Sequence, residues 1–307
     1  MAISAVMVKM LRDKTGAGML DCKSALEEAK GDAEEAEKIL RKKGLAAAAK
    51  KAGRVAADGL IGHEVSNGVA ALIELNCETD FVAKTEKFRQ ALHALTNYVH
   101  GHAAFGDTAD GDTAALTAAA PPSKMPHRGA TIAESLQAFT GDLGEKTEVR
   151  RFTRLVAGPG AQLTLYAHPG DKTVVVIETK GMPEDLSRDL AMHVAALSPQ
   201  FATRDGVSAK ALADEKEIAR AKAVAAGKPE AVAEKMVEGM INKWYGEVVL
   251  LDQVFVKDET QSKKVAQVIA ERGGKDASVV RFVRFKVGEG IEKKSGDFAA
   301  EVAALTK

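Results

Sequence analysis

The chain has 307 residues, and its 43 Lys and Arg balance its 43 Asp and Glu, so the formal net charge is zero. Such a chain lacks the excess of cations that neutralises phosphates, so we expect no direct nucleic-acid partner. No stretch reaches the roughly 18 to 20 consecutive apolar residues of a membrane span, and two cysteines cannot form a disulfide framework. We therefore expect a cytoplasmic protein without a membrane partner and, at about 150 residues per domain, roughly two domains.

Residues 1–54 have the apolar spacing of helices. The glycines at 16–18 predict a tight turn after a first helix. Asp21 is predicted to cap a second helix and Asp32 a third, with Gly44 ending the third. Three helices in so short a segment bury a small core, so this module is expected to dock on something else as well.

From residue 55 the apolar period changes from 3.6 to 2. The apolar runs 60–65 and 69–75 flank Ser66-Asn67-Gly68, and Asn-Gly between apolar runs is the strongest short-range hairpin signal. A helix with apolar residues from 88 to 99 follows. Residues 101–130 are rich in Ala, Gly, Thr, Asp and Pro, which predicts a flexible or poorly packed low-complexity insert.

Further strands are expected at 148–157, 162–166 and 172–179, and a helix from Pro183 to Leu197, so that a second block repeats the order of the first. In both blocks a hairpin and a strand ending in Ile-Glu precede a loop and a helix. The repetition predicts two similar subdomains.

Two helices at 208–226 and 230–245 are separated by Gly227-Lys228-Pro229, which predicts an antiparallel helical hairpin, a coiled coil. A strand is expected at 247–256, a helix carrying Val265 to Ile269, a strand at 279–287 and a last amphipathic helix at 298–305. The hairpin is thus inserted into the second subdomain.

These patterns predict an α+β fold with an N-terminal three-helix module, two similar antiparallel-sheet and helix subdomains, an inserted helical hairpin and a C-terminal helix. The expected domains are a helical module and connector at 1–54, a first core subdomain at 55–159, a second at 160–199 and 249–287, the hairpin at 200–248, and a C-terminal module at 288–307.

The sequence offers little enzyme chemistry. It has no P-loop, no His-Glu-x-x-His and no Gly-x-Ser-x-Gly motif. His93, His100 and His102 form a histidine cluster without a cysteine or carboxylate at ligand spacing, so a fraying helix end is favoured over a metal site. Cys77 has no base placed beside it, which favours a buried thiol over a nucleophile. We expect neither a cofactor nor a metal.

The segment Thr79-Asp80-Phe81-Val82 joins a strand to a helix, where a polar loop would suffice. Thr79 is expected to cap the helix, with Asp80 at its positive end. Phe81 lies seven residues before Phe88 on one helical stripe, so its spacing allows either a core residue or an exposed anchor.

Other positions have two interpretations each. Met19 and Leu20 follow the glycine turn and suit either a core or an exposed apolar tip. His168 lies in a Pro-Gly turn where no structural need for a ring is evident, and such a histidine is more often a solvated bystander than a functional residue. His193 lies on an apolar stripe, which favours a core histidine.

Six stretches of the chain together resemble the elongation factor Ts family, the nucleotide exchange factors of elongation factor Tu. They occur in the family's order and span nearly the whole chain. They are 15–23 (TGAGMLDCK), 49–53 with 56–59 (AKKAG, AADG), 76–84 (NCETDFVAK), 227–229 with 233–239 (GKP, AEKMVEG), 284–292 (RFKVGEGIE) and 297–304 (DFAAEVAA).

The resemblance implies roles for single residues. Thr79, Asp80, Phe81 and Val82 match the tetrapeptide associated with displacing Mg²⁺ from the partner, with the phenylalanine exposed as a wedge. Arg12, Met19 and Leu20 match positions that contact the partner's G domain, and His168 matches a histidine that contacts another partner domain. Pro169 after this turn histidine, and Met240 where the family usually has Arg, depart from the pattern.

The resemblance thus implies a non-enzymatic exchange factor that binds elongation factor Tu·GDP and promotes GDP release, so that GTP can rebind. Two alternatives remain at this point. One is a binding partner or chaperone of a GTPase that does not promote exchange, and the other is a thiol or metal enzyme using Cys77 and the histidine cluster.

Overall fold

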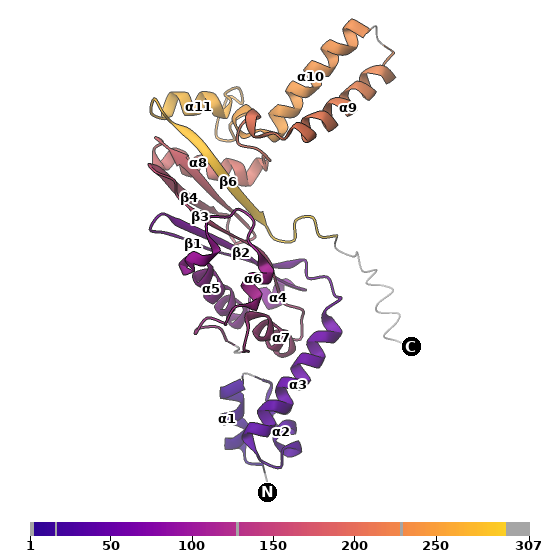
Figure 1. Ribbon diagram of the computed structural model, residues 1–307, viewed down its shortest axis with the longest axis vertical. Coiled ribbons are helices and arrows are strands. Elements are labelled where there is room, and N and C mark those ends of the chain that lie inside the picture. The colour runs from indigo at the N-terminus through magenta and orange to yellow at the C-terminus, as the bar shows by residue number, and fades with distance from the viewer. Residues whose placement is uncertain (1–2, 16, 127–128, 228–229, 293–307) are drawn as a thin grey trace.

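The computed structural model describes residues 3–15, 17–126, 129–227 and 230–292. Figure 1 shows an elongated molecule with a group of helices at the N-terminal end, two sheets in the middle and a helical hairpin at the far end. This is the α+β arrangement predicted from the sequence. The helix predicted at 298–305 lies outside the described residues.

The N-terminal module consists of α1 (Ala5–Thr15), α2 (Met19–Glu28) and α3 (Ala33–Lys51) around a small core that includes Leu11 and Leu26. Asp32 caps α3 as predicted, because its carboxylate accepts the N–H groups of Glu34 and Glu35. The prediction for Asp21 was wrong. Helix α2 already begins at Met19, so Asp21 lies in its first turn.

Gly44 does not end α3, which continues to Lys51. The reason is tertiary: a Cβ on Gly141 of α7 (Ile132–Leu143) would lie 3.0 Å from the Cα of Gly44. The two glycines therefore let the helices approach closely. This packing outweighs the roughly 1 kcal/mol that a glycine costs inside a helix.

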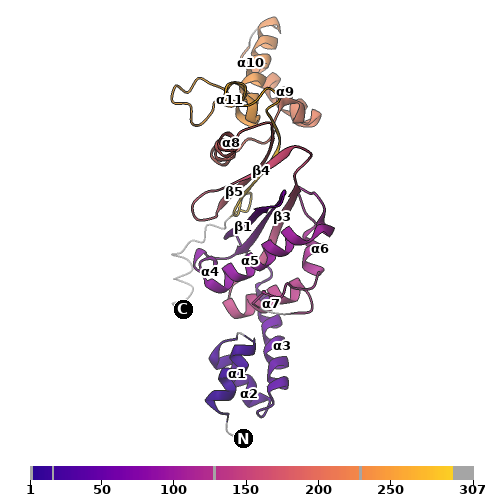
Figure 2. The ribbon, with the colours of Figure 1, turned by 90° about the vertical axis from the view of Figure 1, so that its left-hand side faces the viewer.

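The first sheet contains β1 (Asp58–Ser66), β2 (Val69–Cys77) and β3 (Glu148–Val156), antiparallel in that order. Asn67 and Gly68 have φ values of 51° and 71°, which confirms the predicted hairpin turn. Figure 2 shows α4 (Asp80–Ala83), α5 (Glu86–Gly101) and α7 together on one side of this sheet. Between them lies a core centred on Phe88, Phe139 and Phe152.

The segment 101–130 packs better than expected. It contains η1 (Ala103–Phe105) and α6 (Thr113–Ala118), and Leu116 and Met125 are buried in the core of the first sheet. Thr108 also forms a bridge to Arg154 on β3. A few apolar residues anchor a segment whose overall composition suggested a poorly packed insert.

The second sheet contains β4 (Ala161–Ala167), β5 (Thr173–Lys180) and β6 (Ser278–Lys286), again antiparallel in chain order. Helices α8 (Glu184–Leu197) and α11 (Val265–Arg272) contribute to its core. Both central strands shift register directly after a glutamate, Glu74 in β2 and Glu178 in β5. The two sheets are therefore built alike, as the repeated pattern predicted.

The predicted helical hairpin is formed by α9 (Ala209–Ala225) and α10 (Glu230–Val248) after the short turn η2 (Arg204–Gly206). The strand predicted at 247–256 was wrong. Helix α10 extends into it, η3 (Leu250–Asp252) follows, and Val249 and Val254 form only isolated bridges. Val249 and Leu250 are fully buried, and a short buried apolar run does not distinguish strand from helix.

The two sheets pack face to face through a second apolar layer that includes Ile61, Leu72 and Val176. Two buried carboxylates lie at the border of this layer, Glu74 and Glu178. Each accepts hydrogen bonds from arginine side chains of its own sheet and one from a backbone N–H just beyond the other sheet. Glu74 accepts from Arg150 at 3.0 Å, from Arg151 at 2.6 Å and from the Gly288 N–H at 2.8 Å. Glu178 accepts from Arg281 at 2.6 Å and from the Gly158 N–H at 2.7 Å.

None of the helices in the described residues is both long and apolar enough to span a membrane.

Candidate functional site

The candidate site is the junction between β2 and α5, where the chain turns through the four-residue helix α4. Thr79 is the N-cap of α4, and its hydroxyl accepts the N–H of Val82 at 3.5 Å. Asp80 occupies the first turn, where a negative charge is favourable. The capping predicted for this segment is confirmed.

Phe81 is 79% exposed, whereas Phe88 is completely buried. The exposed alternative for Phe81 is therefore correct. The next two residues anchor the helix, because Ala83 is buried and Val82 packs against the core of the first sheet. Helix α4 thus packs one side against the core and presents an aromatic ring to solvent on the other.

Asp80 and Lys84 form an ion pair at 2.5 Å beside this ring, and the Lys84 ammonium lies 6.0 Å from the centroid of Phe81. The hydrogen bond from Lys84 lowers the pKa of Asp80, and the charge of Lys172 acts in the same direction. Asp80 is therefore an anion at neutral pH. The junction combines a solvent-facing ring with a carboxylate, and both stand on one helical turn.

Two glutamates link the junction to the loop between α7 and β3. The carboxylate of Glu145 accepts the N–H of Thr79 at 2.9 Å and its hydroxyl at 2.6 Å. Glu78 accepts the N–H of Lys146 at 2.7 Å and pairs with Arg54 at 3.1 Å. Sequence reasoning missed Glu145, which follows a helix end 66 residues from Thr79 and carries no local signal.

Cys77 is fully buried, as favoured from the sequence. Its thiol donates to the Thr79 carbonyl at 3.1 Å. Burial, together with the nearby charges of Glu145 and Asp58, raises the pKa of the Cys77 thiol to about 12. Since the thiolate is the reactive form, this thiol is unsuited to nucleophilic chemistry.

The histidines of the predicted cluster have different neighbours. His100 lies 3.2 Å from the Val69 carbonyl at the hairpin turn, His93 contacts Asn97, and His102 stacks on a tyrosine. Across the described part of the chain, no three His, Cys, Asp or Glu side chains are grouped so as to hold a metal ion. His193 is a core residue as expected, bonded to Gln253 at 2.9 Å.

Of the partner-contact residues implied by the resemblance, Arg12, Met19 and Leu20 lie on the N-terminal module and are exposed, Met19 by 59% and Leu20 by 83%. The exposed alternative is therefore correct for the apolar pair. Figure 1 places α1 and α2 at the end of the molecule, well separated from α4.

His168 is exposed in the turn between β4 and β5, where its Nδ1 lies 3.2 Å from the Tyr166 hydroxyl. The same turn reaches the first sheet. The Asp171 carbonyl accepts the N–H of Ile61 at 2.9 Å, and Lys172 pairs with Asp58 at 2.8 Å. Helix α4 also lies against β1, so the turn and α4 contact the same strand.

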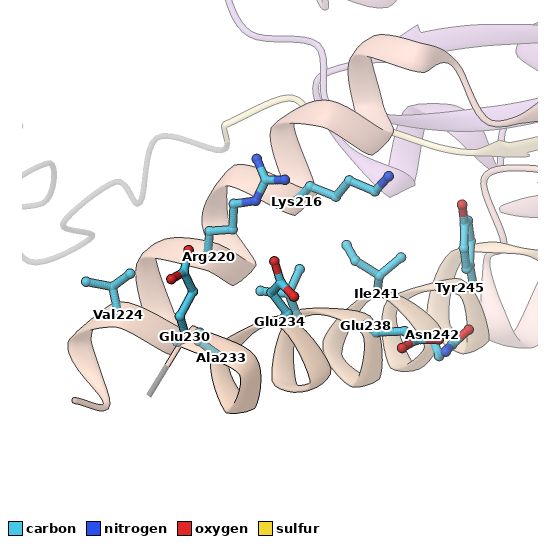
Figure 3. A pocket seen from close by; sticks show the side chains of 12 residues that line it. Lys216, Arg220, Val224, Glu230, Ala233, Glu234, Glu238, Ile241, Asn242 and Tyr245 are labelled. Atoms are coloured by element: carbon cyan, nitrogen blue, oxygen red, sulfur yellow. The ribbon is translucent and has the colours of Figure 1, made fainter. Parts of the chain in front are cut away.

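A pocket in the described residues lies elsewhere, between α9 and α10. It is a groove of about 700 Å³ with an apolar floor that includes Ile241. Figure 3 shows the basic side chains of Lys216 and Arg220 on α9 and the acidic side chains of Glu230 and Glu234 on α10. The groove is part of the hairpin and shares no residue with the α4 junction.

Comparison with known proteins identifies the family of the chain. The model of the family described as Elongation factor TS matches residues 78–289. Proteins named Elongation factor Ts are 44% identical over the whole of both chains in Syntrophotalea carbinolica, and 42% identical in Lactiplantibacillus plantarum over 98% of this chain and 97% of the relative. A third, from Idiomarina loihiensis, is 44% identical over 99% of this chain and 97% of its own. The chain therefore belongs to the elongation factor Ts family of translation elongation factors.

Proposed function

We propose that this chain is a guanine nucleotide exchange factor. It binds elongation factor Tu in its GDP-bound form and promotes GDP release by displacing Mg²⁺ and distorting the nucleotide site, so that GTP can rebind. The observation that carries this proposal is the 79% exposure of Phe81 on a helix whose other side is anchored in the core. An exposed aromatic ring on a fixed support is suited to insertion into another protein.

Exchange of this kind needs no covalent chemistry from the factor. A GTPase holds GDP through backbone N–H groups, a lysine and Mg²⁺. A factor that binds the nucleotide-free state better than the loaded state weakens GDP binding, and GDP weakens the factor's binding equally. In this proposal Phe81 and the anionic Asp80 disturb the surroundings of Mg²⁺ and phosphate, while Thr79 and Val82 fix the turn that carries them.

The ring alone is too weak to explain exchange of a tightly held nucleotide. Burying a phenylalanine contributes roughly 1.5 to 3 kcal/mol, or about one to two decades in affinity. The remaining free energy must come from contacts elsewhere. We assign these to Arg12, Met19 and Leu20 on the N-terminal module and to His168 in the β4–β5 turn, all of which are exposed.

The proposal is tested by loading elongation factor Tu with fluorescent GDP and following the signal in a stopped-flow instrument. We expect the wild-type chain to accelerate GDP release, and Phe81→Ala and Asp80→Ala to do so less. Unchanged release by both variants would contradict the roles of these residues. Binding of the wild-type chain without faster release would favour a partner or chaperone that does not promote exchange.

A further inference from the structure

We infer that Glu145 is a positioning residue for exchange, which fixes the α4 turn so that Phe81 is held ready for insertion. This inference rests on the proposed exchange function and concerns the geometry beneath the exposed ring. Glu145 lies in the loop between α7 and β3, outside the segment that carries Phe81. It reaches that segment through two hydrogen bonds from Thr79.

All backbone and side-chain polar groups of Thr79 have partners. Its N–H and hydroxyl donate to the two carboxylate oxygens of Glu145, at 2.9 and 2.6 Å. Its hydroxyl oxygen also accepts the N–H of Val82, and its carbonyl accepts the thiol of Cys77. The residue two positions before Phe81 is therefore fixed from three directions.

Helix α4 needs this external support because it has only four residues. A single helical turn is unstable by itself, since few hydrogen bonds offset the cost of ordering its backbone. The side chain of Lys84, at its end, is exposed and donates a hydrogen bond to Asp80 of the same turn. The N-cap is consequently the point at which the turn is tied to the rest of the protein by polar contacts.

An ionised carboxylate suits this role better than other side chains. It offers two acceptor oxygens and can take both Thr79 donors at once, and hydrogen bonds to a charged acceptor are the stronger ones. Glutamine offers one acceptor oxygen, so it can satisfy one donor and must present its amide to the hydroxyl oxygen. Alanine offers none and leaves both donors without this partner.

Glu145 is itself held in place. Gly144 ends α7 in the left-handed conformation with φ of 77°, which turns the chain toward the junction. The next N–H, that of Lys146, donates to Glu78 at 2.7 Å. Helix α7 packs against α3 of the N-terminal module through Gly141 and Gly44. The two hydrogen bonds from Thr79 to Glu145 form a clamp, and the loop that carries Glu145 follows a helix that packs against the N-terminal module.

The clamp predicts a specific kinetic pattern. If Glu145 is removed, the turn is in its binding-competent state for only part of the time, and the apparent affinity falls by that fraction. We expect Glu145→Ala to raise the half-saturating concentration for GDP release about tenfold, since a lost bond to a charged group is of that order. The maximal rate should stay within about twofold, because docking on the partner reorders the turn. Phe81→Ala should instead lower the maximal rate.

The experiment uses the full chain and fluorescent-GDP-loaded elongation factor Tu, with release rates measured across factor concentrations. The variants are Glu145→Ala, Glu145→Gln, Phe81→Ala and the double variant Glu145→Ala with Phe81→Ala. Glu145→Gln should recover part of the loss. In the Phe81→Ala background, removal of Glu145 should have little further effect, because a residue that acts through the ring cannot act once the ring is gone. Glu271→Gln, which removes a carboxylate on α11 that pairs with Lys263, serves as the matched control.

Amide hydrogen exchange over residues 78–84 gives a second measurement that does not need the partner. We expect faster exchange in Glu145→Ala and an intermediate rate in Glu145→Gln, with unchanged exchange in the second sheet. If Glu145→Ala does not fold, Glu145→Gln and Thr79→Val decide the question by the same two measurements.

Unchanged half-saturating concentration and unchanged amide exchange in the Glu145 variants would overturn the clamp while leaving the exchange function intact. The clamp would also be overturned if Glu145→Ala raised the half-saturating concentration equally in the wild-type and the Phe81→Ala backgrounds, because Glu145 would then act independently of the ring. If the wild-type chain itself does not accelerate release, the exchange function fails, and the clamp fails with it as a device for exchange.

Discussion

Replacement of Phe81 by alanine should separate activity from stability. The ring is 79% exposed, so its removal leaves no cavity and should change the free energy of unfolding by less than about 0.5 kcal/mol. Insertion into a partner would bury most of this exposed area. Since complete burial of a phenylalanine contributes roughly 1.5 to 3 kcal/mol, about four fifths of that, or about 1 to 2.5 kcal/mol, should be lost from the docked state. This corresponds to a roughly five- to sixtyfold decrease in exchange efficiency.

Phe88 provides the matched control, because it is the same residue type seven positions away and completely buried. Phe88→Ala should cost about 3 to 5 kcal/mol of stability. Urea denaturation followed by circular dichroism measures stability for both variants, and fluorescent-GDP release from elongation factor Tu measures exchange. The two variants should therefore differ in which property they lose. Phe81→Ala should keep its stability but promote GDP release more slowly, whereas Phe88→Ala should lose stability.

Two outcomes would refute this reasoning. A loss of more than about 1 kcal/mol of stability in Phe81→Ala would mean that the ring packs against its own chain. Full exchange efficiency in a stable Phe81→Ala would mean that the exposed ring is not inserted into the partner.

Three further predictions concern other parts of the chain. The double variant Met19→Ser and Leu20→Ser should raise the half-saturating concentration for exchange at least about tenfold without loss of stability. The control Val224→Ser, at a residue 73% exposed on the helical hairpin, should leave this concentration unchanged. Equal effects of the two changes would contradict a specific contact by the N-terminal module. Cys77→Ser keeps a donor at this position and should retain exchange within about twofold, and complete loss of exchange in a folded variant would point to thiol chemistry. Burial lowers the pKa of His193 below its ordinary 6.5. The unfolded chain therefore takes up a proton near pH 6.5 that the folded chain does not, so the free energy of unfolding should decrease as the pH falls below about 6.5. Denaturation at pH 7.5 and 5.5 should show a smaller decrease in His193→Gln, and an equal decrease would exclude His193 as its source.

Local signals predicted much of the fold. Asn67-Gly68 predicted a hairpin because few residue pairs accept positive φ at both positions, and both angles are positive in the structure. Asp32 and Thr79 predicted helix starts because their side chains accept N–H groups two or three residues on. Such bonds form within a few residues, so the sequence alone specifies them.

Features that depend on distant contacts were not predicted. Gly44 lies inside a helix because another glycine, Gly141, packs against it, and no local pattern reveals this. For Phe81 the spacing allowed both a core and an exposed residue, and only the family resemblance favoured exposure. Glu145 remained unnoticed because its importance comes from a contact 66 residues away, whereas a glutamate after a glycine is unremarkable in sequence.

The hydrogen bonds by which Glu74 and Glu178 each accept a backbone N–H from just beyond the other sheet have a consequence for synthesis on the ribosome. Glu74 receives one of its hydrogen bonds from Gly288, which is 214 residues further along the chain. At a translation rate of about 5 to 20 residues per second, this donor emerges roughly 10 to 40 s after the acceptor. During that interval the early half exposes an apolar layer and a carboxylate with an incomplete set of bonds. Nascent chains that stall before β6 should therefore be recognised by chaperones or proteases as unfinished.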